Sequence, residues 1–125
     1  MAKVTGFGGA FLRVGDPAAL YAWYEKHLGL ARAEGAGCFM FSAAEQKADT
    51  VVAFFKEQDT YWPPSQRAML NFQVDDVNAV LDALLAAGVE VDPKRDSYSY
   101  GRFGWFTDPE GNRVELYEPA AEAAP

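Results

Sequence analysis

Glu115, His27 and Cys38 carry side chains that could serve as a base, a ligand or a nucleophile, but their sequence contexts differ. His27, the only histidine, follows Trp23 and Tyr24 at the spacing of one helix face, which favours a packing role over catalysis. Cys38, the only cysteine, has no accompanying His, Asn or Asp constellation, so we interpret it as a small buried strand residue. The GFGG stretch at 6–9 has no preceding strand and no following GK[ST], and it indicates a flexible strand start rather than a phosphate loop.

Glu115 is the strongest of these candidates because of the pattern around it. Val114 and Leu116 are apolar neighbours, so strand alternation sends Glu115 and Tyr117 to the opposite face of the sheet. Two interpretations stand. Glu115 is either an ordinary carboxylate on a surface strand or a functional group that pairs with a cationic ligand or acts as a base.

Aromatic residues are more abundant than a small core requires. The chain has nine Phe, six Tyr and three Trp, and its predicted helices already bring apolar faces of their own. Strand parity puts Phe103 and Trp105 on one face and Gly104 and Phe106 on the other, without showing which pair points inward. The segments YWPPSQR (61–67) and DSYSYGR (96–102) are either loops at the mouth of a ligand cleft or ordinary surface loops.

Composition limits the class of protein. A chain of 125 residues, half of them apolar, has room for one packed domain. Its net charge of −7 argues against nucleic acid and anionic membranes and would attract a cationic small molecule. No signal-peptide pattern and no long apolar run is present, so we expect a cytoplasmic protein, and a single Cys and a single His exclude Cys- or His-rich metal sites.

The elements that must position these residues are repeated along the chain. Alternation over 10–14 predicts a strand, and Asp16 caps a predicted helix that ends at Gly29. The same order returns 59 to 60 residues later, with a strand over 70–74 and a helix from Asp76 to Gly88.

Short β-type runs follow each predicted helix. They lie at 38–41 and 51–55 in the first half and at 89–91, 103–106 and 114–117 in the second, where DPEGN (108–112) predicts a hairpin turn. We therefore expect an α+β fold in one domain, with a βαβββ module at about 5–57, a linker at 58–66, a second module at 67–118 and a frayed tail at 119–125. Packing the two sheets together would leave a cleft between them.

The order of these motifs resembles the vicinal oxygen chelate superfamily, which includes glyoxalases, bleomycin resistance proteins and extradiol dioxygenases. The resemblance rests on WYEKHLGL (23–30), VDDVNAVLDALLAAGVEV (74–91) and GRFGWFTDPEGNRVELYEP (101–119). It implies two βαβββ modules that form a U-shaped mixed sheet around a central cleft, commonly in a homodimer. It also implies metal ligands on the first and last strands of each module.

In this chain the positions implied as metal ligands are mostly occupied by residues that cannot bind metal. The positions on the first strand of each module are Gly9 and Met69. The positions on the last strand fall near Ala53 in the first module and at Glu115 in the second, and only Glu115 can act as a ligand. We therefore expect no cofactor and no metal, with a divalent ion completed by a residue such as Gln73 as the less favoured alternative.

The preferred hypothesis is a protein that binds a small aromatic or cationic molecule in a metal-free cleft. The alternative is a lyase, isomerase or dioxygenase-like enzyme that uses Glu115 as a base or metal anchor, and a third is a subunit whose pocket is vestigial. Glu115 is the one candidate catalytic residue. The expected ligand-binding set is Gly9, Phe11, Trp62, Met69, Asn71, Tyr100, Phe103, Trp105 and Glu115.

Overall fold

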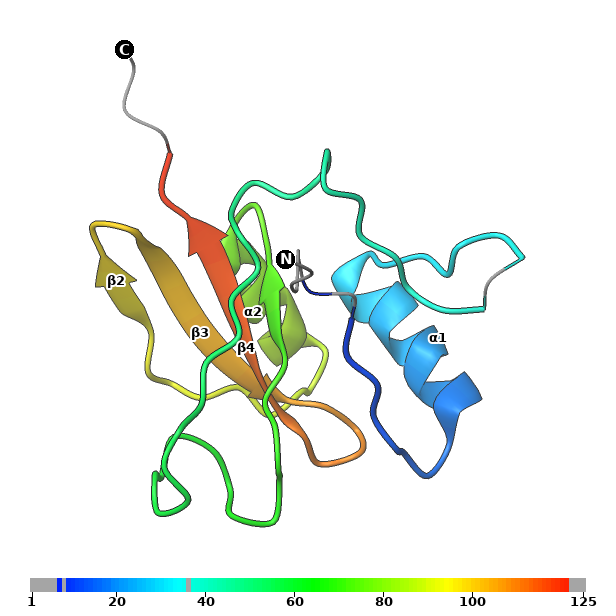
Figure 1. Cartoon of the computed structure of the whole chain (residues 1–125), viewed down its shortest axis with the longest axis horizontal. Coiled ribbons are helices and arrows are strands. Elements are labelled where there is room, and N and C mark those ends of the chain that lie inside the picture. The colour runs from blue at the N-terminus through cyan, green and yellow to red at the C-terminus, as the bar shows by residue number, and fades with distance from the viewer. Residues whose placement is uncertain (1–6, 8, 36, 122–125) are drawn as a thin grey trace, which may run out of the picture.

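The computed structural model describes residues 7, 9–35 and 37–121 and contains two helices and one four-stranded sheet (Figure 1). The fold is α+β, as the sequence predicts. In chain order the elements are α1 (Pro17–Leu28), β1 (Asn71–Gln73), α2 (Val77–Ala86), β2 (Asp96–Tyr98), β3 (Gly101–Thr107) and β4 (Arg113–Pro119).

Both helices begin and end where the sequence predicts. The Asp16 carboxylate accepts a hydrogen bond from the Ala19 N–H at 3.1 Å, and the Asp76 carboxylate accepts one from the Ala79 N–H at 3.0 Å. These bonds satisfy backbone donors that the first turn of a helix leaves free. Gly29 adopts a left-handed conformation after α1, with φ of 69°, which glycine does at little cost.

The second half of the chain forms the predicted βαβββ order in a mixed sheet. The strand order is β1-β4-β3-β2, with β1 parallel to β4 and the other pairs antiparallel. The strand that follows α2 lies elsewhere than predicted. The sequence predicts it at 89–91, but it lies at Asp96–Tyr98, and Val91 makes only an isolated bridge to Phe106. Pro93 explains the break, since proline has no N–H to continue the ladder.

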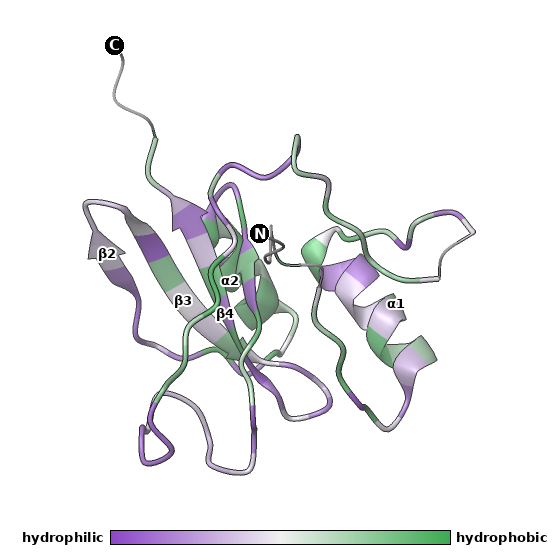
Figure 2. Cartoon of the chain, in the orientation of Figure 1, coloured by the Kyte–Doolittle hydropathy of each residue, from purple (hydrophilic) through white to green (hydrophobic). Residues whose placement is uncertain are grey.

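One face of this sheet carries the core, and both helices pack on it. Leu81 of α2 is fully buried over Gly104, and a Cβ on that glycine would overlap the Leu81 side chain. From α1, Tyr24 packs on Phe72 and Trp23 stacks on Phe106. The apolar colouring of α2 in Figure 2 marks this layer, whose fully buried members are Val77, Leu81, Leu84, Phe106, Val114 and Leu116.

The first half does not form the predicted strands. The segments 10–14, 38–41 and 51–55 contain no ladder, and only Phe39 makes a bridge, to Arg32. Leu12, in the predicted strand at 10–14, is exposed, as are Phe11 and Phe54 at 97% each. Alternating sequence becomes a strand only when a neighbouring strand satisfies its backbone groups, and within the described part of this chain these segments have no such neighbour.

Side-chain hydrogen bonds tie the first half to the sheet, among them those of Gln73 with the backbone of Lys47 and Ala48. The Tyr24 hydroxyl donates to the Asp108 carboxylate at 3.0 Å, and Asp108 also accepts from the Glu110 and Asn112 backbone N–H groups of the hairpin turn. The Glu110 carboxylate accepts from the Gly15 N–H at 2.9 Å. Neither helix is long and apolar enough to cross a membrane, as far as the described residues extend.

Candidate functional site around Glu115

The sheet face opposite the helices, called the open face below, brings together polar and aromatic side chains from three strands. Register pairs Trp105 with Glu115 and Phe103 with Tyr117 across β3 and β4, and pairs Asn71 of β1 with Glu115. Paired residues in neighbouring strands point to the same side. The structure therefore decides the question left open by strand parity, because Phe103 and Trp105 share the face of Glu115 while Phe106 enters the core.

Glu115 is the centre of a hydrogen-bond cluster on this face. The residue is 9% exposed, and its carboxylate accepts from the Trp105 indole N–H at 3.1 Å, the Asn71 side-chain amide at 2.6 Å and the Tyr61 hydroxyl. Buried carboxylates are costly unless such donors compensate for lost water. All three donors are neutral side chains, so none of them forms an ion pair with the carboxylate.

Tyr61 reaches Glu115 from the segment 56–66, called the strap below, which lies mainly in the green loops at the lower end of the sheet in Figure 1. Its ring packs edge to face on Trp105, with 5.9 Å between the ring centroids, and its centroid lies 5.6 Å from that of Phe55. Burial raises the pKa of Tyr61 above its usual range, and the hydrogen bond to Glu115 raises it further. The hydroxyl therefore stays protonated at neutral pH and acts as a donor.

The far end of the strap is fixed to β4 through Gln66 and Arg113. The Gln66 amide accepts from the Arg113 backbone N–H and donates to the Arg113 carbonyl, both at 2.8 Å, which extends the ladder with a side chain. The Arg113 guanidinium donates to the Tyr61 carbonyl at 3.1 Å and to Asp92 at 2.9 Å, and lies 5.3 Å from the Trp105 ring centroid. The hydrogen bond from the Lys94 backbone N–H holds the pKa of Asp92 below its usual range, and Arg113 lowers it to a smaller extent.

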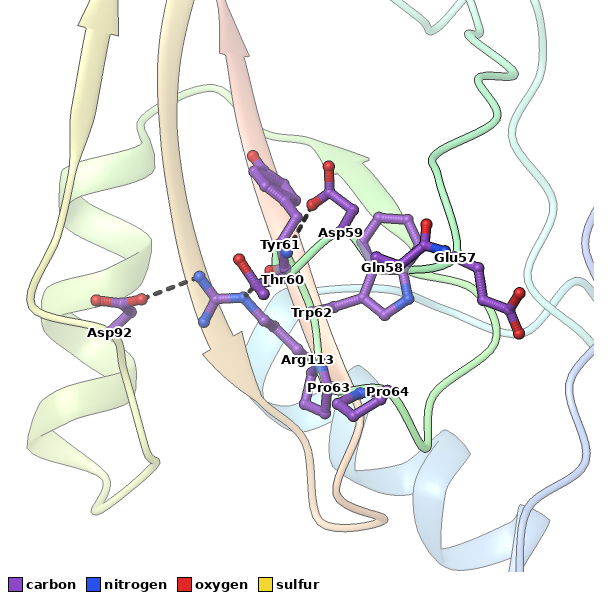
Figure 3. A pocket seen from close by; sticks show the side chains of 10 residues that line it. All are labelled: Glu57, Gln58, Asp59, Thr60, Tyr61, Trp62, Pro63, Pro64, Asp92 and Arg113. Carbon is purple, nitrogen blue, oxygen red and sulfur yellow. Dashed lines mark hydrogen bonds and ion pairs between the residues drawn. The ribbon is translucent and has the colours of Figure 1, made fainter.

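A cavity of about 540 Å³ lies between the strap and the Asp92–Arg113 pair (Figure 3). Tyr61, Trp62, Pro63 and Pro64 contribute apolar surface. Glu57 and Asp59 add acidic groups to its wall. Tyr61 lines this cavity and also contacts Glu115, so the cavity and the Glu115 cluster share one side chain.

A row of stacked rings continues along the open face from Phe103. Phe103 stacks on Tyr117 at 4.9 Å, and Tyr98 stacks on Tyr100 at 5.2 Å with their planes 7° apart. The Asp96 carboxylate beside Tyr98 raises the pKa of that phenol. Tyr98 and Tyr100 are exposed and offer flat surfaces to solvent.

The structure brings together most, but not all, of the expected site residues. Asn71, Phe103, Trp105 and Glu115 share the open face, Trp62 packs on Phe55 beside Tyr61, and Tyr100 lies 5.9 Å from Phe103. Met69 is half-buried next to β1. Gly9 and Phe11 are exposed, and no atom lies within 4 Å of a Cβ built on Gly9, so they are not gathered around Glu115.

Arg113, near the cluster, and Tyr61, within it, were absent from the predicted set. Arg113 could have been included, because it has the same strand parity as Glu115 and Tyr117. Tyr61 is adjacent to the predicted Trp62, but its contact with Glu115 spans 54 residues and has no local sequence signal. The other two candidates lie in the first half. The His27 ring packs against Trp23 within α1, with 4.9 Å between the ring centroids, and Cys38 is half-buried.

The residues around Glu115 do not fit a family-type metal centre. Hydrogen atoms of a phenol, an indole and an amide point at the carboxylate, where a divalent cation would require further lone pairs. Residues 7, 9–35 and 37–121 hold no group of three or more His, Cys, Asp or Glu placed to bind a metal.

Comparison with known proteins places these observations in a family context. The model of the Glyoxalase/Bleomycin resistance protein/Dioxygenase superfamily matches residues 6–116. No curated protein matches significantly. Among solved structures, TnmS3, described as an antibiotic binding protein from Streptomyces sp. CB03234, is 31% identical with a TM-score of 0.50 and covers 86% of this chain and 89% of its own.

Two more distant structures support the fold alone. The integron cassette protein VCH_CASS1 from V. cholerae is 22% identical with a TM-score of 0.62, covering 96% of this chain and 99% of its own. The fosfomycin resistance protein FosX from Listeria monocytogenes, solved with Mn(II) and sulfate, is 18% identical with a TM-score of 0.59, covering 96% and 94%.

Proposed function

Because the chain belongs to the glyoxalase/bleomycin resistance protein/dioxygenase superfamily, we propose that it binds a small aromatic or cationic molecule on its open face, at Glu115, without a metal. The observation that carries the proposal is the Glu115 carboxylate, buried among aromatic rings and compensated only by neutral donors. Such a group attracts a cation, and the neighbouring rings provide faces and edges for a flat ligand.

The charge and lining of the site support a cationic ligand. The chain carries a net charge of −7. Arg113, which lies near Trp105, is already paired with Asp92. An incoming cation at Glu115 therefore meets no free positive charge among the contacts of the carboxylate. The 31% identity to an antibiotic binding protein supports a ligand of small-molecule size.

The donor set supports metal-free binding. Tyr61 and Trp105 donate to one carboxylate oxygen and Asn71 donates to the other, so the groups around Glu115 are hydrogen-bond donors rather than further metal ligands. Binding without turnover needs only that the ligand's donor reach this carboxylate.

A thermal-shift and metal-content experiment tests this proposal. Protein purified without chelator is analysed for metal and then screened with benzamidine, a planar acridine cation, catechol and a glutathione thioether, with and without EDTA. We expect an aromatic cation to raise the melting temperature equally in both conditions. Glu115→Gln should abolish the shift, whereas Glu34→Gln, which changes an exposed carboxylate, should retain it.

Stoichiometric metal together with loss of the shift in EDTA would contradict metal-free binding. Turnover of a substrate that is lost in Glu115→Gln would favour the enzyme alternative. Absence of a shift with all four compounds would remove the main support for a cationic or aromatic ligand.

We infer further that the binding form is a homodimer built from two copies of a single domain. The support is the exposed apolar surface of the first half, including Phe11, Val51 and Phe54, together with segments predicted as strands that have no ladder partner in the described chain. Sedimentation analysis should give a dimer for the wild type and a shift toward monomer for Phe54→Ser. A monomeric wild type at all concentrations would overturn the inference.

A further inference from the structure

We propose that Tyr61 is a built-in competitor of the ligand, whose hydroxyl occupies the position at Glu115 that a hydrogen-bond donor of the ligand must take. The inference rests on the proposed function, since it states how the Glu115 site is opened and which chemical group it selects. The group is an N–H-bearing organic cation on an aromatic ring.

The first step is that the site is closed in this structure. Trp105 is 2% exposed and Glu115 is 9% exposed, so a ligand cannot reach either while Tyr61 stays in place. The Tyr61 ring packs against Trp105 and its hydroxyl binds Glu115, so the same side chain covers both. Binding at Glu115 therefore requires that a covering group move.

The second step is that Tyr61 is the donor able to leave. Trp105 and Asn71 belong to β3 and β1, whose backbones are held in the ladder with β4. Tyr61 belongs to the strap, which has no regular secondary structure. Side chains in loops change rotamer more easily than strand residues whose neighbours are packed around them.

The third step is that Tyr61 has space to enter. The cavity of about 540 Å³ is bounded by Tyr61 itself and lies beside the strap (Figure 3). Rotation of the Tyr61 side chain leaves the Gln66–Arg113 hydrogen bonds intact, because these involve other residues of the strap and β4. The strap can therefore stay anchored while the phenol departs.

The ligand class follows from what the departing phenol leaves behind. The indole of Trp105 and the amide of Asn71 still donate, and the carboxylate lacks one donor. A positively charged N–H group forms a stronger bond with a carboxylate than a neutral phenol does, so it can displace Tyr61. An aromatic ring carrying that group can also take the place of the phenol ring against Trp105 and Phe55.

Calorimetric titration of benzamidine into wild type and Tyr61→Phe tests the proposal. Benzamidine has a ring the size of phenol and an amidinium donor. Tyr61→Phe keeps the ring and removes the competing hydroxyl, so we expect about fivefold to tenfold tighter binding than to wild type. Tyr21→Phe is the matched control, since Tyr21 lies on α1 and contacts Phe39, and it should bind as wild type does.

Benzamide, which is neutral but similar in shape, should bind more weakly than benzamidine to both proteins. Equal affinity of wild type and Tyr61→Phe for benzamidine would overturn the competition, and weaker binding to Tyr61→Phe would show that the hydroxyl contacts the ligand. Absence of benzamidine binding to Tyr61→Phe would overturn the assigned ligand class. The proposed function would survive any of these results if another compound of the screen bound in a Glu115-dependent way.

If Tyr61→Phe proves unstable, Glu115→Gln provides a second route. A glutamine at this position removes the charge that favours a cation over the phenol, so benzamidine should lose its advantage over benzamide. An unchanged preference for benzamidine in Glu115→Gln would contradict the proposal.

Discussion

The two halves of the chain follow the same order of sequence motifs but differ in how much they bury. The second half, over 71–119, forms the sheet and α2. The side chains of Val77, Leu81 and Leu84 on α2 are fully buried. In the first half Tyr24 is the one buried residue of α1, and the expected strands do not form. The comparison teaches that an alternating pattern determines which side chains can share a face, whereas a paired neighbour determines whether a strand forms.

The candidate site lies at the boundary between these regions. Glu115, Trp105 and Asn71 are supplied by the well-packed half, and Tyr61 by the strap that follows the poorly packed half. A rigid carboxylate cluster is thus covered by a side chain on a less constrained segment. This division of rigidity is the basis for treating Tyr61 as the movable part.

Truncating one apolar residue in each half gives the largest expected difference. Leu81→Ala should reduce the free energy of unfolding by about 2–5 kcal/mol, because it leaves a cavity under α2 over Gly104. Phe54→Ala removes a larger side chain that is 97% exposed, and at protein concentrations that keep the chain monomeric its effect should stay within about 0.5 kcal/mol. Urea denaturation followed by circular dichroism measures both. A comparable loss for Phe54→Ala would mean that the first half is as well packed as the second.

The sequence predicts those features whose signals are local. The two Asp N-caps, Gly29 and the DPEGN turn are short-range signals, and the structure contains all of them. Strand alternation predicts which residues share a side within each strand. The register between strands then places Glu115, Trp105 and Asn71 on the same face. The Tyr61–Glu115 contact, the pairing of Gln66 with Arg113 and the missing ladder at 10–14 depend on how distant segments meet, and no local pattern encodes that.

The Tyr24–Asp108 bond should contribute an intermediate amount, because it is a buried contact that joins the halves. Tyr24→Phe should lower the free energy of unfolding by about 1.5 kcal/mol near pH 8, since a hydrogen bond to a carboxylate is lost. Burial, then the charge and hydrogen bond of Asp108, raise the pKa of Tyr24 above its ordinary 10.0. The native state therefore keeps this proton at pH values where the unfolded chain releases it.

The sign of the pH dependence follows from this difference. Above pH 10 the unfolded state binds fewer protons than the native state, so stability falls as pH rises, by up to about 1.4 kcal/mol per pH unit for one such tyrosine. Tyr24→Phe removes this contribution, and the deficit of the variant should shrink between pH 8 and pH 11. Urea titrations at the two pH values check it, with Tyr21→Phe as the control. A deficit that grows with pH would contradict the assignment.

The two N-caps provide the smallest and most closely matched test of the difference between the halves. Asp16 and Asp76 make the same hydrogen bond, at 3.1 and 3.0 Å, to the N–H three residues later. Asp76→Ala should lower global stability by about 1 kcal/mol, because α2 unfolds only when the core does. Asp16→Ala should cost less globally and mainly increase hydrogen exchange at the α1 amides, since α1 has one buried residue. Equal global losses would show that α1 unfolds together with the sheet, coupled to it through contacts such as the Tyr24–Asp108 bond.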